Sequence, residues 1–298
     1  MPRHVMPTQQ TGRVLPKLLL SILLAMLALV GVMAWHTWQL STRQTPVAAR
    51  PGIKVDAQAA AVRLGRAVQQ ATIWMPDDQN AEAFEALHRH LAASFPKVHA
   101  TLKLQSFGQH ALLYTWAGKD PKAQPIAFLA HQDVVPIAPG TEKDWQAPPF
   151  SGVLKDGFVW GRGAWDDKGN LMAIMEAVEM LLQSGFQPRQ TTYLAFGADE
   201  EVGGEHGARL IADWFKQQHI RLRFALDEGL LITHGMVPGV RKPVALIGLA
   251  EKGYLTLNVT ARAQPGHASM PPMRSAIGTV GEAVARVETH QMPPHLSG

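Results

Sequence analysis

Histidine and acidic residues follow several apolar segments of this 298-residue chain, at the points where those segments end. The four clusters are His131-Gln132-Asp133, Asp166-Asp167, Asp199-Glu200-Glu201 and Asp227-Glu228. In open α/β sheets, ligands bind at the carboxyl ends of the strands. Because the chain contains no cysteine, a metal bound there would be held by imidazole and carboxylate groups. A single cluster of this kind is typical of a solvated turn, whereas four at successive segment ends indicate a metal site.

Two of the clusters contain residue pairs whose spacing suits metal-dependent hydrolysis. In an extended segment, residues 131 and 133 point the same way, so Asp133 can accept the second ring N–H of His131 and orient the ring. Consecutive glutamates project in different directions, so one of Glu200 and Glu201 can bind a metal while the other accepts a proton from water. The simpler interpretations are an Asx-turn with a surface histidine, and a solvated acidic turn.

Asp166 and Asp167 lie between a glycine-rich turn and a long amphipathic segment. Adjacent carboxylates repel each other unless a cation lies beside them. Asp166 could therefore offer one oxygen to each of two cations. Helix capping is the alternative explanation, because Asp167 stands where the N-cap of the following helix is expected.

The segments that must position these residues alternate between two periodicities. Helical spacing predicts helices over residues 59–70, 80–93, 168–183 and 208–216, and apolar β-type runs predict strands over 111–116, 126–130, 191–196 and 223–226. Strands that alternate with helices of this length indicate an α/β fold. We expect a mixed sheet covered by helices on both faces.

The N-terminal region has a different character. Residues 18–35 carry no charge and contain Ser21 as their one polar residue, and three basic residues precede them. This pattern predicts a transmembrane anchor over residues 18–38, with the N-terminus cytoplasmic and the remaining chain periplasmic or otherwise extracytoplasmic. A cleaved secretory signal, with a small-residue site at Val32-Met33-Ala34, is the alternative.

The net charge of +4 belongs to this N-terminal region. The first 50 residues hold five bases and no acid, which leaves 23 bases against 24 acids in the other 248 residues. The near-neutral body shows no basic stripe with interleaved aromatic residues, the pattern that binding to nucleic acid requires. We therefore expect no nucleic-acid partner.

Six ordered motifs resemble the M20 family of zinc peptidases, and within it carboxypeptidase S and the related N-acyl-amino-acid hydrolases. They are HQDVVP (131–136), DWQAPPFSG (144–152), GRGAWDDKGN (161–170), FGADEEVGG (196–204), ALDEG (225–229) and PGHASMPP (265–272). The resemblance implies hydrolysis of an amide bond next to a free carboxylate, in a peptide or an N-acyl amino acid, with two zinc ions at the complete active site.

The resemblance also implies a role for each matching residue. His131 and Asp227 would hold one zinc ion, Glu201 would hold the second, and Asp166 would bridge the two. Glu200 would be the general base that takes a proton from the attacking water.

Three further residues receive roles outside the zinc ligands. Asp133 would orient His131, and Asp167 would shape the turn beside the bridging carboxylate. His267 would stabilise the oxyanion of the scissile carbonyl, in dimeric members across the subunit interface. A homodimer formed through the smaller domain that contains His267 is therefore an expected partner.

The motifs predict the following organisation of the chain. Residues 1–17 form a cytoplasmic tail, 18–38 the signal-anchor, 39–56 a linker, 57–250 an incomplete catalytic domain, and 251–298 the start of a lid or dimerisation domain. In the family, a histidine beyond this point completes the second zinc site, and neither His290 nor His295 is expected to replace it. We therefore expect an N-terminal portion of a longer protein. The alternative is an inactive, membrane-anchored fragment that has a partial metal site and acts only by binding.

Overall fold

The computed structural model describes residues 14–41, 47–48, 53–77, 80–251 and 253–293. The chain divides into two compact units, Met1–Asp56 and Ala57–Gly298. Most of the expected cytoplasmic tail, much of the expected linker, and His295 lie outside the described residues.

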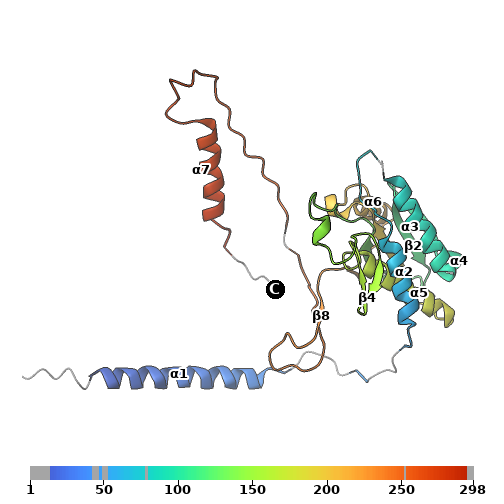
Figure 1. Ribbon diagram of the computed structural model, residues 1–298. Coiled ribbons are helices and arrows are strands. Elements are labelled where there is room, and N and C mark those ends of the chain that lie inside the picture. Colours follow the sequence, from blue (N-terminus) through green and yellow to red (C-terminus); the bar gives the residue numbers. More distant parts are fainter. Residues whose placement is uncertain (1–13, 42–46, 49–52, 78–79, 252, 294–298) are drawn as a thin grey trace, which may run out of the picture. The chain divides into compact units, whose positions relative to one another are not determined.

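The first unit contains one long helix, α1 (Val14–Gln39) (Figure 1). Within Pro16–Gln39, an 18-residue window has a mean hydropathy of 2.6 and no buried residue, so the helix is long and apolar enough to cross a membrane. Its two hydroxyl side chains bond inside the helix: Ser21 donates to the Lys17 carbonyl and Thr37 to the Met33 carbonyl. The predicted apolar helix is confirmed, and a signal sequence would meet the same criteria.

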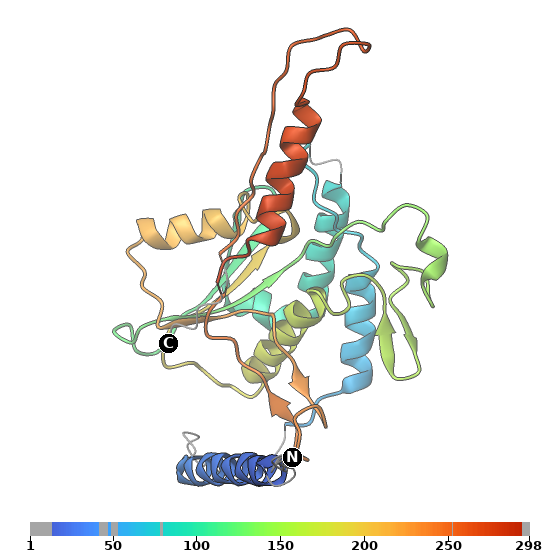
Figure 2. The same ribbon diagram turned by 90° about the vertical axis from the view of Figure 1, so that its left-hand side faces the viewer.

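The second unit is built on a five-stranded sheet (Figures 1 and 2). In spatial order its strands are β1 (Lys103–Phe107), β2 (Ala111–Trp116), β6 (Thr192–Gly197), β3 (Ile126–His131) and β7 (Phe224–Leu226). Strands β1, β2 and β6 pair antiparallel, whereas β3 runs parallel to both β6 and β7. The predicted mixed sheet is therefore confirmed.

Helices cover both faces of this sheet. The helices are α2 (Ala57–Val68), α3 (Ala81–Ser94), α4 (Pro96–Thr101), α5 (Lys168–Gln183) and α6 (Ala208–Gln217). Residues of α2, α4 and α5 pack into one core cluster with Leu112, Tyr114 and Phe196. Residues of α6 pack into a second cluster with Leu113 and Ala195, on the opposite side of the sheet (Figure 2). Alternate residues of one strand thus enter different cores, as the period of two in a strand requires.

Several short elements and one longer helix lie outside the predicted set. They are strand β1, helix α4, the hairpins β4–β5 (Val153–Lys155 and Phe158–Trp160) and β8–β9 (Ile232–Thr233 and Val244–Ala245), two 3-10 turns (Glu142–Asp144 and Glu200–Val202) and helix α7 (Ala276–Thr289). The hairpin strands are two or three residues long, which is too short for a periodicity to be recognised. From residue 246 to residue 275, the described residues form no helix or strand.

A buried acid on α5 holds the start of α4. Glu179 is 6% exposed, and its carboxylate accepts hydrogen bonds from the main-chain N–H groups of Lys97 (3.2 Å) and Val98 (2.9 Å). These N–H groups belong to the first turn of α4, where no helical carbonyl is available to them. The negative charge also interacts favourably with the positive end of the helix dipole.

We therefore expect Glu179→Ala to lower the free energy of unfolding by about 2–3 kcal/mol, because two buried donors lose a charged acceptor. Urea unfolding of the detergent-solubilised chain, followed by tryptophan fluorescence, measures this change. Glu142→Ala is the control, since that side chain is exposed and the substitution should have little effect. Equal stability of the two variants would contradict this account of α4.

Candidate metal centre

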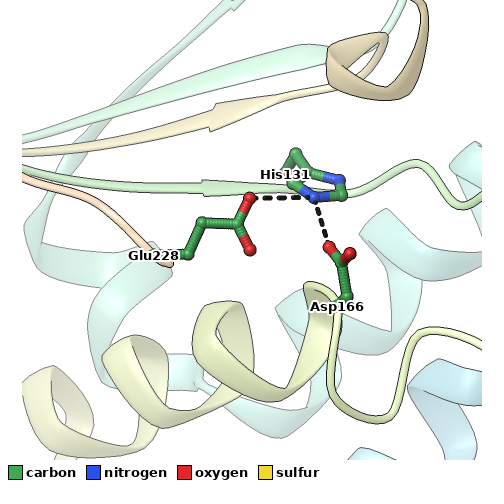
Figure 3. A group of neighbouring side chains, drawn as sticks. All are labelled: His131, Asp166 and Glu228. Atoms are coloured by element: carbon green, nitrogen blue, oxygen red, sulfur yellow. Dashed lines mark hydrogen bonds and ion pairs between the residues drawn. The ribbon is translucent and has the colours of Figure 1, made fainter. Parts of the chain in front are cut away.

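Three side chains from separate segments meet at the end of β3 (Figure 3). His131 is the last residue of the strand and is 2% exposed. Its Nε2 atom lies 2.9 Å from Asp166 Oδ1 and 3.3 Å from Glu228 Oε1. One ligand atom from each of the three residues lies within 4.8 Å of the other two.

The topology explains why these segments meet. Strands β3, β6 and β7 are parallel, so their carboxyl ends lie at the same edge of the sheet. Glu228 follows β7 by two residues, and Asp166 belongs to the turn that leads into α5. Ligand-binding residues are expected at this edge in an α/β fold.

The ring of His131 is oriented through its other nitrogen. Nδ1 lies 3.0 Å from the main-chain oxygen of Asp133 and 3.3 Å from the Oδ1 atom of the same residue. Because both oxygens are acceptors, Nδ1 carries a proton. Nε2 faces the carboxylates of Asp166 and Glu228, so it is the ring nitrogen that a metal among these groups would reach, in place of its proton. The main-chain N–H of His131 donates to Asp167 Oδ2 at 3.1 Å, so the buried Asp167 also supports this strand end.

The Asp133 carboxylate connects this histidine to the loop after β6. It is fully buried and accepts hydrogen bonds from the main-chain N–H groups of Glu200 (3.1 Å) and Glu201 (3.0 Å). The Glu200 side chain, which is 55% exposed, then places Oε2 3.9 Å from His131 Nε2. Asp133 thus holds the position of both glutamates relative to the histidine.

The charges in this region favour a bound cation. Partial burial raises the pKa values of Glu200, Glu201 and Glu228, and the nearby Asp166 carboxylate raises each of them further. Burial by itself would lower the pKa of His131, but the carboxylates around it, led by Asp133, prevail and raise it to about 10. A divalent cation would relieve the repulsion among these acids, and an imidazole nitrogen with carboxylate oxygens is a donor set that suits zinc.

The other site residues predicted from the sequence lie outside the group formed by His131, Asp166 and Glu228. Asp227 is exposed, and its Oδ1 atom accepts the main-chain N–H of Glu228 at 3.0 Å. Glu201 is partly buried, and its pKa responds to Asp166. His267 is exposed and bonds locally, with Nδ1 2.8 Å from Ser269 Oγ. Sequence reasoning missed the approach of Glu228 to His131, although Glu228 stands in the motif that supplied Asp227.

A pocket of about 310 Å³ opens beside the cluster. His131, Glu200, Asp227 and Glu228 contribute its polar part. Much of the remaining lining is apolar and includes Leu129, Ala195, Ile211, Phe215 and Leu222. The pocket can therefore hold an apolar group next to the acidic residues.

Comparison with known proteins gives a match to one family. The sequence model of the family described as Peptidase family M20/M25/M40 matches residues 127–297, which include His131 and all the acidic residues discussed above.

Individual relatives match over a longer part of the chain. The N-fatty-acyl-amino acid synthase/hydrolase PM20D1.1 of Danio rerio is 42% identical over 230 residues, which cover 76% of this chain and 44% of that protein. The probable carboxypeptidase S-like 2 of Dictyostelium discoideum is 41% identical over 242 residues, 79% of this chain and 46% of that protein. Carboxypeptidase S of Saccharomyces cerevisiae is 36% identical over 238 residues, 77% of this chain and 40% of that protein. The chain thus spans less than half the length of these relatives.

The register of the sheet bears on whether Asp227 or Glu228 binds a metal beside His131. Phe128 of β3 is paired with Leu226 of β7, so continuation of the parallel register places Asp227 beside Leu129. Leu129 and His131 lie on the same face of β3, because they are two residues apart. The register therefore places Asp227 on the face of the sheet that carries His131. Glu228 falls on the other face and reaches His131 through its longer side chain.

We expect Asp227→Ala to weaken Zn²⁺ binding by at least about 10–100-fold, the loss typical even of removing a group that only orients a ligand. Glu228→Ala should have a smaller effect. Competition with a chromophoric chelator measures both affinities, and Asp213→Ala, a change to a half-exposed acid on α6 that pairs with Arg209, is the control. A larger loss in Glu228→Ala would assign the ligand position to Glu228.

Proposed function

Because this chain belongs to Peptidase family M20/M25/M40, in the branch of carboxypeptidase S and the N-fatty-acyl-amino acid hydrolases, we propose that it forms the catalytic part of a metal-dependent hydrolase. The bond cleaved is an amide next to a free carboxylate, in a peptide or an N-acyl amino acid. The observation that carries this proposal is the convergence of His131, Asp166 and Glu228 at the carboxyl end of the parallel strands, with Glu200 close by.

The proposed metal ligands follow from the motifs. His131 and Asp227 would hold one zinc ion, Glu201 would hold a second, and Asp166 would be a ligand of both. When bound, the two ions would polarise the amide carbonyl and make the attacking water more acidic.

Glu200 is the proposed general base and acid. Its carboxylate takes a proton from the water whose oxygen attacks the amide carbon, and returns that proton to the nitrogen as the C–N bond breaks. The products are a carboxylic acid and a free amine. The position of Glu200 supports this role, because its main chain is held by Asp133 while its side chain is 55% exposed to solvent, where a substrate could reach it.

Two other residues complete the proposed machinery. Asp133 orients His131 and the loop of Glu200. His267 stabilises the negative charge on the carbonyl oxygen during attack. Residues 251–298, which contain His267, are the proposed start of the lid domain through which a homodimer forms.

The pocket beside the cluster supports an apolar group on the substrate. Leu129, Ile211 and Phe215 line it next to Glu200, so an aliphatic acyl chain or an apolar side chain would lose contact with water there. The names of the relatives include both fatty-acyl amino acids and a carboxypeptidase. N-acyl amino acids with aliphatic acyl groups and apolar dipeptides are therefore the substrates to assay first.

We expect Glu200→Gln to lower kcat for such substrates by about 10²–10⁴-fold, the usual contribution of a general base. Zinc content should change little, because the amide keeps the size of the side chain and only loses the capacity to accept the proton. Turnover of the intact protein and elemental analysis of the same samples test this expectation. Loss of zinc from Glu200→Gln would reassign the residue as a ligand. An intact protein that binds zinc without hydrolysing either substrate would favour the binding-only alternative.

Helix α1 is the proposed membrane anchor. Its apolar stretch is exposed along its whole length and follows a basic segment, so the N-terminus is expected on the cytoplasmic side and the second unit on the extracytoplasmic side.

In right-side-out membrane vesicles, added protease should therefore digest residues 57–298, and in inverted vesicles it should leave them intact. Immunoblotting of the second unit reads out both cases. Protection in right-side-out vesicles would contradict the proposed orientation, and release of the second unit into the soluble fraction after cleavage near Ala34 would identify a signal sequence.

A further inference from the structure

We propose that Gln132 and His88 form a brace that positions the metal-binding end of β3 against the end of β6. This inference rests on the proposed function, because its consequence is the placement of His131 relative to Glu200. Gln132 stands between the ligand His131 and the orienting Asp133, and no role has been assigned to it so far.

The side chain of Gln132 is completely buried and joins three parts of the fold. Its Nε2 atom lies within hydrogen-bonding distance of three main-chain carbonyl oxygens: that of His110 (2.9 Å), that of Phe196 (3.1 Å) and that of Gly197 (3.2 Å). Phe196 and Gly197 are the last two residues of β6, and His110 precedes β2. Gln132 thus bonds to the chain at the ends of two neighbouring strands.

These acceptors determine the orientation of the Gln132 amide and the tautomer of His88. Carbonyl oxygens only accept, so the NH₂ group of Gln132 must face them and its Oε1 atom must face away. Oε1 lies 2.7 Å from His88 Nε2, so the histidine must donate its N–H there. Burial lowers the pKa of His88, which favours the neutral ring, and the bond to Gln132 Oε1 places its proton on Nε2.

The main chain of residue 132 is held as well. Its N–H donates to the Gly197 carbonyl at 2.9 Å, and its carbonyl accepts the hydroxyl of Thr72 at 2.6 Å. Because side chains alternate along a strand, Gln132 points away from the face that carries His131. The brace therefore acts on the metal site through the backbone of β3 and makes no contact with substrate.

Two ties connect the end of β3 to the end of β6 and the loop that follows. Gln132 binds the carbonyls of Phe196 and Gly197, and the Asp133 carboxylate binds the N–H groups of Glu200 and Glu201. Together they determine the offset between His131 and the two glutamates. Without the first tie, the end of β3 can pivot about Asp133. Metal binding must then order the ligands, which lowers the metal affinity.

His88 connects the brace to helix α3, which is remote from the metal centre in the sequence. One turn earlier on this helix, Phe84 stacks on the ring of His110, with 4.4 Å between centroids. The same residue, His110, supplies one of the carbonyls that Gln132 binds. Helix α3 thus holds both the donor to Gln132 and the segment that Gln132 binds.

A purely structural role is the competing explanation, in which Gln132 only satisfies buried carbonyl groups. Both explanations predict a lower stability when the brace is broken. They differ in the metal site, because only a positioning role changes metal affinity, the geometry of the bound metal and the protection of the Glu200 loop in the folded protein.

The test compares variants that remove the donor of His88 with one that keeps it. His88→Met retains a comparable length without a donor, and Gln132→Met removes the same bond from the other side. His88→Gln keeps an N–H near the position of Nε2. His90→Met is the matched control, since His90 lies on the same helix and its Nε2 atom is 2.8 Å from the Arg63 carbonyl, outside the site.

Three measurements are made on the detergent-solubilised chain: Zn²⁺ affinity by chelator competition, the visible absorption spectrum of bound Co²⁺, and amide hydrogen exchange over residues 196–201 without metal. We expect His88→Met and Gln132→Met to weaken Zn²⁺ binding by about 10-fold or more, the effect of losing an outer partner of a ligand. Both should also alter the Co²⁺ spectrum and speed exchange at Glu200 and Glu201, whereas His88→Gln and His90→Met should resemble the wild type.

Wild-type Zn²⁺ affinity, Co²⁺ spectrum and hydrogen exchange in folded His88→Met would overturn the proposal, even if its melting temperature were lower. If His88→Met does not fold, Gln132→Met and the rescue by His88→Gln decide in the same way. An intact protein that binds zinc without hydrolysing substrate would refute the proposed function, while the brace would still be tested by these measurements. If the wild type binds no zinc, unchanged exchange in the variants would still refute the brace.

Discussion

The buried carboxylate of Asp133 is the interaction on which the arrangement of the site depends. A charge without exposure to solvent is costly unless hydrogen bonds compensate it. Here the compensation comes from the main-chain N–H groups of Glu200 and Glu201 and from the neighbouring ring of His131. The same bonds that stabilise the carboxylate therefore align the proposed ligand with the proposed base. A change at Asp133 would disturb both at once.

The acids around His131 are arranged so that their mutual repulsion favours the binding of a cation. Asp166, Glu200, Glu201 and Glu228 gather at one edge of the sheet, and burial and mutual repulsion raise the pKa values of the three glutamates. In the protein without metal, bringing these groups together costs free energy. A bound divalent cation would offset that cost. Because β3, β6 and β7 run parallel side by side, the residues that follow them stay close together.

Most of the elements that build this edge are predictable from local sequence. The helix over residues 168–183 and the strand over 111–116 are observed with the predicted bounds, and the four segment ends that carry acids or histidine lie at or near the same edge. Periodicity succeeds here because each element is long enough to bury one regular face. It fails for the hairpin strands of two or three residues and for α4, whose first turn depends on Glu179 from a distant helix.

The sequence by itself thus determined the fold class, the apolar N-terminal helix and the choice of residues that could bind a metal, because these follow from residue type and local spacing. Tertiary structure alone decided which of them meet. It brought Glu228 to His131 and left Asp227 exposed, and it joined Gln132 to His88 across 44 residues of chain. Such contacts depend on strand order, register and side-chain length in three dimensions, and no local pattern in the chain encodes them.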